Sequence, residues 1–260
     1  MENILGGIYH IGNMKVLFLV QSCNQERFLE EEEIIRKTWG SRLRKGCDLI
    51  FYRGDGTDTL EGDVLKLKSD DDLKHTFTKT IRALSVFRNS NKYDFIVRTN
   101  TSTWINVELL LNTLDRLDPD VRELYGGYLV SNAESQGAPF LRGNFIVINK
   151  QIMKDIFEFI KDKCYTGVDD VCLGMNLLKY YNQNNIDYLK TLKIMDNISY
   201  NDEFDLKNIF KYVGVWCASY IKEKNSSSVL NKIDKYYINK TSCQVKKVDK
   251  IETIFGDLKF

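Results

Sequence analysis

Short apolar runs alternate with amphipathic stretches over the N-terminal half of this chain. The runs are rich in β-branched and aromatic residues, whereas the stretches between them carry apolar side chains or ordered charges at helical spacing. We expect strands at residues 15–20, 48–52, 63–67 and 93–97, and helices at residues 30–39 and 76–87. Strands that alternate with helices are typical of a parallel sheet with crossover connections.

The pattern continues along the second half of the chain. The predicted helices there are residues 107–117, 150–163 and 168–181, and the predicted strands are residues 125–130 and 145–148. No internal repeat or domain boundary stands out, so we expect a single α/β domain with a mostly parallel central sheet flanked by helices. The serine-rich stretch at residues 225–228 and the chain ends are expected to be disordered.

Composition narrows the class of protein. With 260 residues, 43% hydrophobic side chains and a formal net charge of +1, the chain can form a core but lacks the basic excess that drives binding to nucleic acid or anionic membranes. No apolar run has the length of a signal peptide or a transmembrane helix, so we expect a cytoplasmic protein. The 2 His and 6 scattered Cys form no zinc-binding spacing.

Polar side chains directly follow two of the predicted strands. Those after the strand at 93–97 are Arg98, Thr99, Asn100, Thr101 and Ser102, and those after the strand at 15–20 are Gln21 and Ser22. In open α/β sheets, ligands bind just outside the carboxyl ends of the strands. These two clusters therefore predict a ligand site at one edge of the sheet.

Several segments share their order and approximate spacing with one known family. They are residues 34–40 (IIRKTWG), 71–80, 98–106 (RTNTSTWIN), 142–148 (RGNFIVI) and 169–174 (DDVCLG). In this order they resemble the I-R-x-T-W-G, D-S-Y-x-N-L-T-x-K-T, K-T-D-D-D-V-F-V-N, glycine-aromatic and E-D-V-x-x-G motifs of the β-1,3-glycosyltransferases and their Fringe relatives. A resemblance spread over residues 15–177 is more specific than one short motif.

The resemblance implies a GT-A-type fold with a Rossmann-like nucleotide-binding half. It implies a nucleotide-sugar-binding half at residues 14–106, an acceptor-binding half at 107–224 and a C-terminal extension at 225–260. The implied activity is an inverting hexosyl transfer from a UDP-sugar donor to a hydroxyl group of a glycan acceptor. We expect a role in microbial or viral surface-glycan synthesis and no nucleic-acid partner.

Asp170 is the candidate general base of this implied reaction. It corresponds to the aspartate of the E-D-V-x-x-G motif, and an inverting transfer needs a base for the acceptor hydroxyl on the face opposite the leaving nucleotide. A carboxylate at a helix N-terminus can accept backbone N–H bonds that hold it ionised and oriented. Asp169 is the second candidate, and a helix-capping role is the structural alternative for both residues.

The leaving-group side departs from the family pattern. The resembled enzymes hold Mn²⁺ with central carboxylates, where this chain has the neutral residues 100–102. Because hard divalent cations prefer carboxylates, Asn100 and Ser102 are poor ligands for Mn²⁺ or Mg²⁺. Three outcomes stay open: a metal held mainly by the donor's phosphates, a cationic side chain in its place, or loss of catalysis. The cationic candidates are Arg98, Lys79 and Arg142.

The resemblance and the strand-end rule together assign the remaining candidates. Those for donor binding are Gln21, Ser22, Arg36, Asp71, Lys79, Arg98, Thr99, Asn100, Thr101 and Ser102, and those for acceptor binding are Trp104, Arg142, Gly143 and Asn144. Trp104 can stack on a sugar or pack beneath the sheet. Taken singly, Arg98, Lys79 and Arg142 are each better explained as solvated surface charges. Arg36 can equally form structural salt bridges, and Ser22 can equally cap a turn.

Two other classes of function compete with a transferase. The missing carboxylates favour a degenerate module that binds a nucleotide or glycan without turnover, whereas the retained Asp169 and Asp170 argue against it. A different nucleotide-dependent α/β enzyme is disfavoured, because neither G-x-G-x-x-G nor G-x-x-x-x-G-K-[ST] occurs in the sequence.

Overall fold

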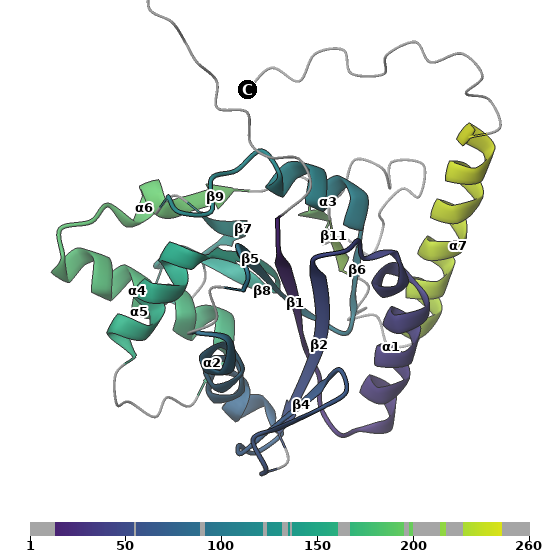
Figure 1. Ribbon diagram of the computed structural model, residues 1–260. Helices are drawn as coiled ribbons and strands as arrows, with labels where there is room; N and C mark the ends of the chain where they lie inside the picture. Colours follow the sequence, from purple (N-terminus) through teal and green to yellow (C-terminus); the bar gives the residue numbers. More distant parts are fainter. Residues whose placement is uncertain are drawn as a thin grey trace, which may run out of the picture.

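The computed structural model describes residues 14–54, 56–88, 92–121, 124–131, 135, 137–160, 167–194, 198–199, 214–216 and 226–245. Over these residues the chain has the predicted α/β fold, with a central sheet flanked by helices (Figure 1). Both chain ends, which the sequence predicts to be disordered, lie outside the described residues.

Among the described residues, eight strands form the central sheet, in the order β3-β4-β2-β1-β5-β8-β7-β9. They are β1 (Val16–Gln21), β2 (Cys47–Gly54), β3 (Thr59–Glu61), β4 (Val64–Leu67), β5 (Phe95–Asn100), β7 (Tyr125–Val130), β8 (Phe140–Asn149) and β9 (Leu192–Ile194). The pairings β1–β2, β1–β5 and β2–β4 are parallel, as predicted for the N-terminal half. The pairings β3–β4, β5–β8 and β7–β8 are antiparallel, so the complete sheet is mixed.

Helices cover both faces of this sheet (Figure 1). One face carries α2 (Thr76–Phe87), α4 (Lys150–Phe159) and α5 (Asp169–Gln183), and the other carries α1 (Glu26–Lys37), α3 (Val107–Leu114) and α7 (Ser226–Val245). Side chains alternate along β1 between the two cores: Phe18 packs in the core with α1, and Leu17 packs in the core with α2. Burial on both faces explains why β1 is a continuous apolar run.

Short elements complete the described chain. They are α6 (Tyr188–Thr191), the 3₁₀ helices η1 (Trp39–Arg42) and η2 (Leu73–His75), and a small sheet of β10 (Ile198–Ser199), β11 (Gly214–Trp216) and β6 (Thr103–Ile105). η2 leads directly into α2, and β6 follows β5 after a two-residue turn. Both connections lie at the end of the sheet where the sequence predicts a ligand site.

β5 is longer than the apolar pattern indicates. The prediction ended the strand at residue 97, but it continues through Asn100, and Arg98 and Thr99 pair with β8. Both side chains are buried, because an ion pair to Asp169 compensates the Arg98 charge and a backbone carbonyl accepts the Thr99 hydroxyl. Hydropathy alone does not reveal such compensation.

α1 begins at Glu26, four residues before the predicted start. The segment before the apolar positions is strongly polar, so its first turn resembles a loop in the sequence. Glu31 and Glu32 therefore lie in the middle of the helix rather than in its first turn, and both are 0% exposed. These carboxylates therefore serve the interior rather than the helix dipole.

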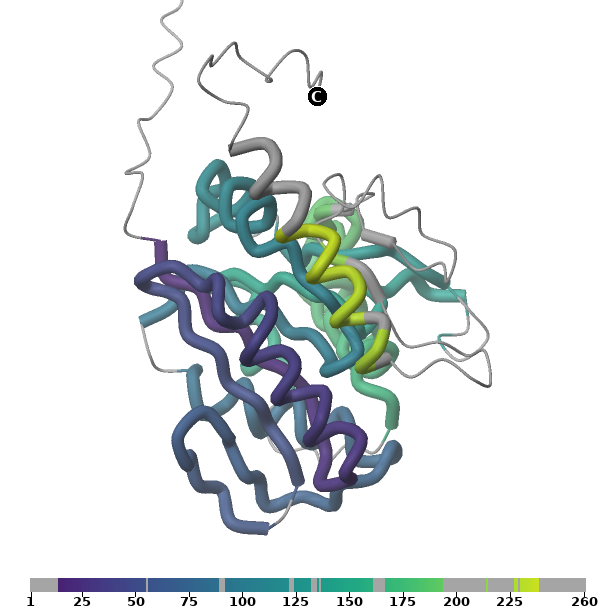
Figure 2. The backbone as a smooth tube through the Cα atoms, turned by 90° about the vertical axis from the view of Figure 1, so that its right-hand side faces the viewer, coloured from purple at the N-terminus to yellow at the C-terminus, as the bar shows by residue number. Residues whose placement is uncertain are grey.

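The C-terminal extension contains a helix that the sequence analysis did not predict. α7 begins at Ser226, within the stretch expected to be disordered, and its residues Leu230, Ile233 and Tyr237 are buried. Figure 2 shows α7 lying beside α1. Buried Asp234 pairs with Arg42 at 2.6 Å, so a buried polar contact as well as apolar packing docks this helix.

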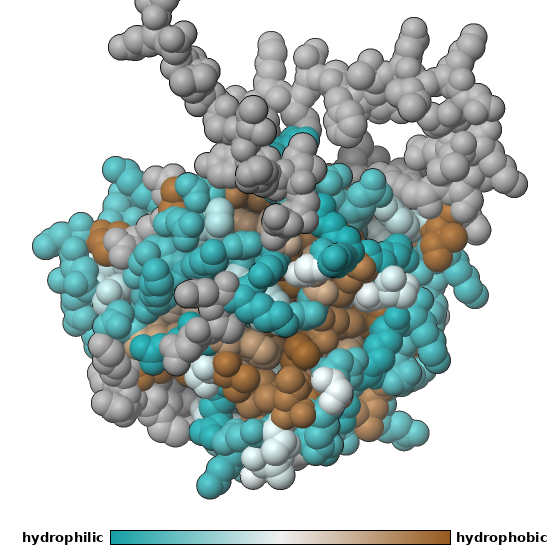
Figure 3. Space-filling model, in the orientation of Figure 1, coloured by the Kyte–Doolittle hydropathy of each residue, from teal (hydrophilic) through white to brown (hydrophobic). Residues whose placement is uncertain are grey.

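The face of the molecule shown in Figure 3 carries several apolar side chains among polar ones. Apolar side chains gather near α2 and β4 on the face shown in Figure 3. The short edge strand β3 is exposed along its length, and Leu60 is 51% exposed. None of the helices that the structure describes is both long enough and apolar enough to cross a bilayer.

Candidate active site

A pocket of about 580 Å³ opens at the carboxyl ends of β1 and β5. Its walls come from the turn after β1, the segment leading into α2, the turn after β5, the middle of β8 and the start of α5. The predicted site residues in its lining are Gln21, Ser22, Asp71, Lys79, Arg98, Asn100, Thr101, Ser102, Arg142, Gly143, Asn144, Asp169 and Asp170. The fold thus brings together residues that lie as far apart as 21 and 170 in the sequence.

Three predicted site residues lie outside this lining. Arg36 pairs with Asp63 and with glutamates of its own helix, beside the ring of Phe51. Thr99 is fully buried and donates its hydroxyl to a backbone carbonyl of β8. Trp104 is 0% exposed, and its indole N–H donates to Asp234 of α7 at 3.1 Å. In this structure Trp104 has the packing role that the sequence analysis left open.

Asp170 projects from the first turn of α5, and backbone N–H groups hold both of its oxygens. Oδ2 accepts from the Gly143 amide at 2.8 Å, and Oδ1 accepts from the Val171 amide at 2.8 Å. Burial raises the pKa of Asp170 above its ordinary value, and the neighbouring Asp169 charge adds to the rise. A carboxylate that is oriented and has a raised pKa is suited to accept a proton.

The strand opposite Asp170 is irregular at this position. The β7–β8 register moves from Gly127 opposite Ile146 to Leu129 opposite Leu141, so β8 carries a bulge. A Cβ atom at Gly143, within this bulge, would lie 3.1 Å from both Arg98 Nη1 and the Asp170 Cβ. Glycine therefore lets the β8 backbone approach the carboxylate closely, and bulges commonly re-aim residues next to active sites.

Arg98 is the central cation of the pocket. Its Nη2 pairs with Asp169, its Nη1 donates to Asn100 Oδ1 at 3.1 Å, and its Nε donates to the Tyr52 hydroxyl at 3.2 Å. Burial alone would lower the pKa of Arg98, but Asp169 and Tyr52 raise it on balance, so the guanidinium stays charged. Asp169 is itself 6% exposed and also accepts from Thr80, so it serves as a buried counter-ion.

This arrangement does not fit a divalent metal at the strand end. The amide oxygen of Asn100, the better of the two predicted ligands, already receives a cationic donor from Arg98. A metal ion bound there would stand beside a guanidinium and would have neutral ligands, both of which are unfavourable. Among the residues that the structure describes, no three His, Cys, Asp or Glu side chains are grouped to hold a metal.

Asp71 and Lys79 fix the rim of the pocket. Lys79 is 2% exposed and pairs with Asp71 at 2.6 Å. Asp71 also accepts the backbone N–H groups of Asn24, after β1, and Gly54, at the end of β2. One carboxylate therefore joins α2, the turn after β1 and the end of β2, of which the first two contribute to the pocket wall.

Behind the pocket wall lie two buried carboxylates of α1 that no sequence motif marked, Glu31 and Glu32. Glu32 accepts the Ser22 hydroxyl at 2.5 Å and two bonds from Arg53, and Glu31 accepts the Thr101 hydroxyl. They thus hold the residues after β1 and β5 in place. One sequence signal could have revealed them. Residues 28, 31, 32 and 35 lie on one face of the helix once it begins at Glu26, so the two glutamates share a face with apolar residues.

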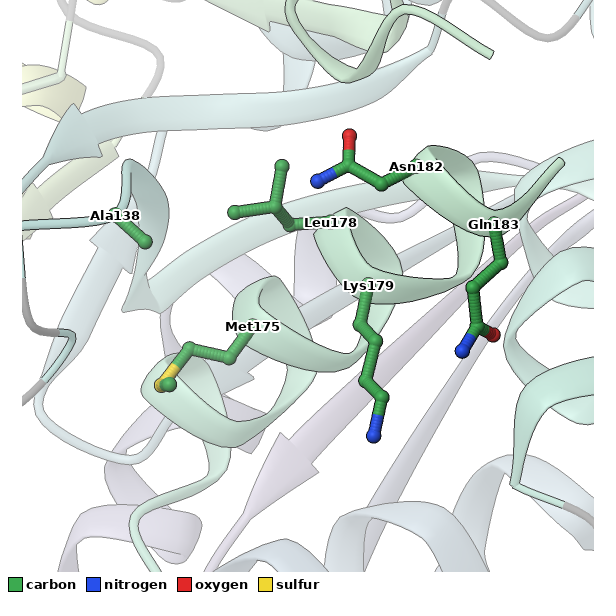
Figure 4. Close-up of a pocket in the computed structure, with 6 residues that line it drawn as sticks. All are labelled: Ala138, Met175, Leu178, Lys179, Asn182 and Gln183. Carbon is green, nitrogen blue, oxygen red and sulfur yellow. The ribbon is translucent and has the colours of Figure 1, made fainter. Parts of the chain in front are cut away.

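A second hollow lies along α5 and is shown in Figure 4. Met175 and Leu178 project from the helix toward Ala138, and the other lining residues are Lys179, Asn182 and Gln183. It contains no carboxylate and shares no residue with the pocket of Asp170. Of these two pockets, only the one at the strand ends is lined by carboxylates.

Comparisons with known proteins give a likeness only to solved structures. No family model matches the chain, and no curated protein sequence matches it. A galactosyltransferase, LgtC, solved with donor and acceptor sugar analogues, has a TM-score of 0.45 and 10% identity, over 87% of this chain and 96% of that chain. A glycosyltransferase involved in glycosylation of the major capsid of PBCV-1 has a TM-score of 0.47 and 9% identity, over 84% and 99% of the two chains.

A third solved structure extends the same set. The mannosyltransferase PcManGT from Pyrobaculum calidifontis, in complex with GDP-Man and Mn²⁺, has a TM-score of 0.38 and 13% identity. The match covers 76% of this chain and 60% of that chain.

Proposed function

We propose that this chain is a GT-A-type inverting glycosyltransferase that moves a sugar from a UDP-sugar to a hydroxyl group of a glycan acceptor. The observation that carries the proposal is the Asp170 carboxylate, held by two backbone N–H groups in a pocket at the strand ends. The position, the raised pKa and the motif resemblance of residues 169–174 all support a general base.

In the proposed reaction, Asp170 accepts the proton of the acceptor hydroxyl. The oxygen then forms a bond to the anomeric carbon of the donor sugar, while the bond from that carbon to the diphosphate oxygen breaks. The diphosphate leaves with the electron pair, and its developing negative charge needs a fixed positive charge nearby. Attack on the face opposite the leaving group gives inversion.

Arg98 is the proposed source of that positive charge. It is buried at the end of β5, it lines the pocket, and it stays charged. A rigid guanidinium with several N–H donors suits phosphate oxygens well. We therefore propose catalysis without a metal at residues 100–102, with Asp169 and Tyr52 holding Arg98 in position.

A degenerate binding module remains the competing function. It is motivated by the neutral residues 100–102, but it leaves the state of Asp170 unexplained. Burial and the neighbouring Asp169 charge disfavour the ionised form of Asp170. A binding protein without turnover would have no evident use for such a carboxylate, whereas a general base requires one. The oriented Asp170 therefore favours an enzyme.

The nucleotide preference is testable by thermal unfolding with UDP, GDP and CMP, each with Mn²⁺ or with a chelator. A ligand at a hundred times its Kd adds about 2.7 kcal/mol to the unfolding free energy, which is a clear shift in melting temperature. We expect UDP to stabilise the protein in the chelator as well as in Mn²⁺.

Other results would change specific parts of the proposal. A UDP shift that requires Mn²⁺ would contradict the assignment of Arg98 and restore a metal site. A shift with GDP or CMP alone would contradict UDP as the donor nucleotide. No shift with any nucleotide would contradict the transferase itself.

A further inference from the structure

Asn144 has a buried side-chain amide that forms no hydrogen bond in the described part of the chain. It is 4% exposed and lines the pocket, yet neither Oδ1 nor Nδ2 has a partner. Burying such a group without a partner is unfavourable, and most buried polar groups in native proteins avoid it. An unpaired amide in a pocket wall is therefore expected to serve a ligand.

The backbone of Asn144, in contrast, is firmly held. Its carbonyl oxygen accepts the hydroxyl of Thr99 at 2.6 Å and the hydroxyl of Thr103 at 3.1 Å. Two other buried groups without partners in the described residues, the hydroxyls of Tyr125 and Tyr188, do not line this pocket. Asn144 thus combines a fixed backbone with a free amide at the site.

The place of Asn144 next to the base restricts what it can bind. The preceding residue, Gly143, donates its N–H to Asp170, and adjacent Cα atoms are about 3.8 Å apart. Asn144 and Asp170 also line the same pocket, so one ligand in this pocket can contact both side chains. The amide offers an acceptor oxygen and N–H donors side by side, so its best partner presents an adjacent donor and acceptor.

We propose that Asn144 binds the acceptor sugar through such a pair on its ring, either two neighbouring hydroxyl groups or the N–H of an acetamido group together with the neighbouring hydroxyl group. This contact places the attacking hydroxyl at Asp170. The inference rests on the proposed function, and it names the acceptor feature that the pocket selects. A nucleobase edge carries the same donor and acceptor pair, so a free nucleoside provides the competing arm of the test.

The test compares Asn144→Ala with the parent protein and with Asn112→Ala, an exposed asparagine of α3. The probes are UDP, uridine, methyl β-glucoside, methyl β-galactoside and N-acetylglucosamine. Binding of each sugar in the presence of UDP is followed by saturation-transfer NMR, and unfolding is followed by melting temperature.

We expect Asn144→Ala to lose at least tenfold in sugar affinity while UDP binding and melting temperature stay equal to the parent or rise. If Asn144 had a structural role, the substitution would remove hydrogen bonds that stabilise the fold, and the melting temperature would fall. The Asn112→Ala control is expected to keep all signals. The simple glycosides compared with N-acetylglucosamine distinguish a hydroxyl pair from an acetamido group.

Several results would overturn the inference and leave the function standing. These are sugar binding that survives Asn144→Ala, loss of uridine binding with sugars retained, a lower melting temperature of this variant, or UDP binding without any sugar signal in the parent. Failure of UDP to bind the parent protein would instead overturn the proposed function and this inference with it.

Discussion

Replacement of Asp170 by asparagine is expected to lower kcat/KM by about 10²–10⁴-fold, the usual contribution of a general base. Asparagine keeps the size of the side chain but cannot take up the acceptor proton. UDP binding should be unchanged, because the proposed diphosphate contact is Arg98. The measurements are product formation and UDP affinity for the parent, for Asp170→Asn and for the remote control Asp118→Asn.

Stability and pH dependence distinguish this result from misfolding. The pKa of Asp170 is higher in the folded protein than in the unfolded chain, so this group stabilises the fold below the unfolded pKa and loses that contribution as the pH rises through the folded pKa. Asp170→Asn should therefore melt at the same temperature as the parent or higher at neutral pH. The parent's kcat/KM should fall on the acid side with an apparent pKa above the ordinary value of 3.8. Turnover that survives the substitution would contradict the assignment of the base.

Arg98→Met is expected to destabilise the fold by about 3–5 kcal/mol, because it leaves the buried Asp169 carboxylate without its counter-ion. The double variant Arg98→Met/Asp169→Leu replaces both charges with apolar groups of similar size. It should recover most of the lost stability, since a buried ion pair contributes little compared with apolar packing.

The catalytic outcome of the double variant is the informative one. We expect the stable double variant to bind UDP more weakly and to form product at least a hundredfold more slowly, because the positive charge at the diphosphate is gone. Denaturant unfolding and UDP titration measure the two effects separately. A double variant with restored stability and parental turnover would contradict the role of Arg98.

The hydrophobic pattern of the sequence predicted most of the sheet. In β1 and β2, for example, the fully buried side chains are apolar or aromatic, so hydropathy reveals these strands directly. The pattern also predicted α2 with the bounds that the structure has. The same pattern failed where polar side chains are buried because ion pairs or hydrogen bonds compensate for their burial. The strand position of Arg98 depends on Asp169, which lies far along the chain, and the length of α1 depends on carboxylates whose partners lie on other elements.

The candidate site was predicted in composition rather than in geometry. The motif resemblance named Asp170 and Arg98, but only the fold shows that the guanidinium contacts Asn100 and that Gly143 holds the carboxylate. The packing of Trp104 against α7 was unpredictable, because no pattern marked α7 as part of the core. A register shift in β8 has no signature in hydropathy, so the positions of residues 142–144 also needed the structure.

The most direct test of the central claim is product formation from a panel of UDP-sugars in the presence of a chelator and a mixture of simple glycosides and oligosaccharides. Mass spectrometry detects the addition of one sugar, and NMR of the product identifies the anomer. We expect UDP release coupled to a β-linked product from an α-linked donor, and we expect Asp170→Asn to reduce this turnover strongly. A product with retained configuration, or UDP binding without any product from any donor, would contradict the proposed inverting transfer.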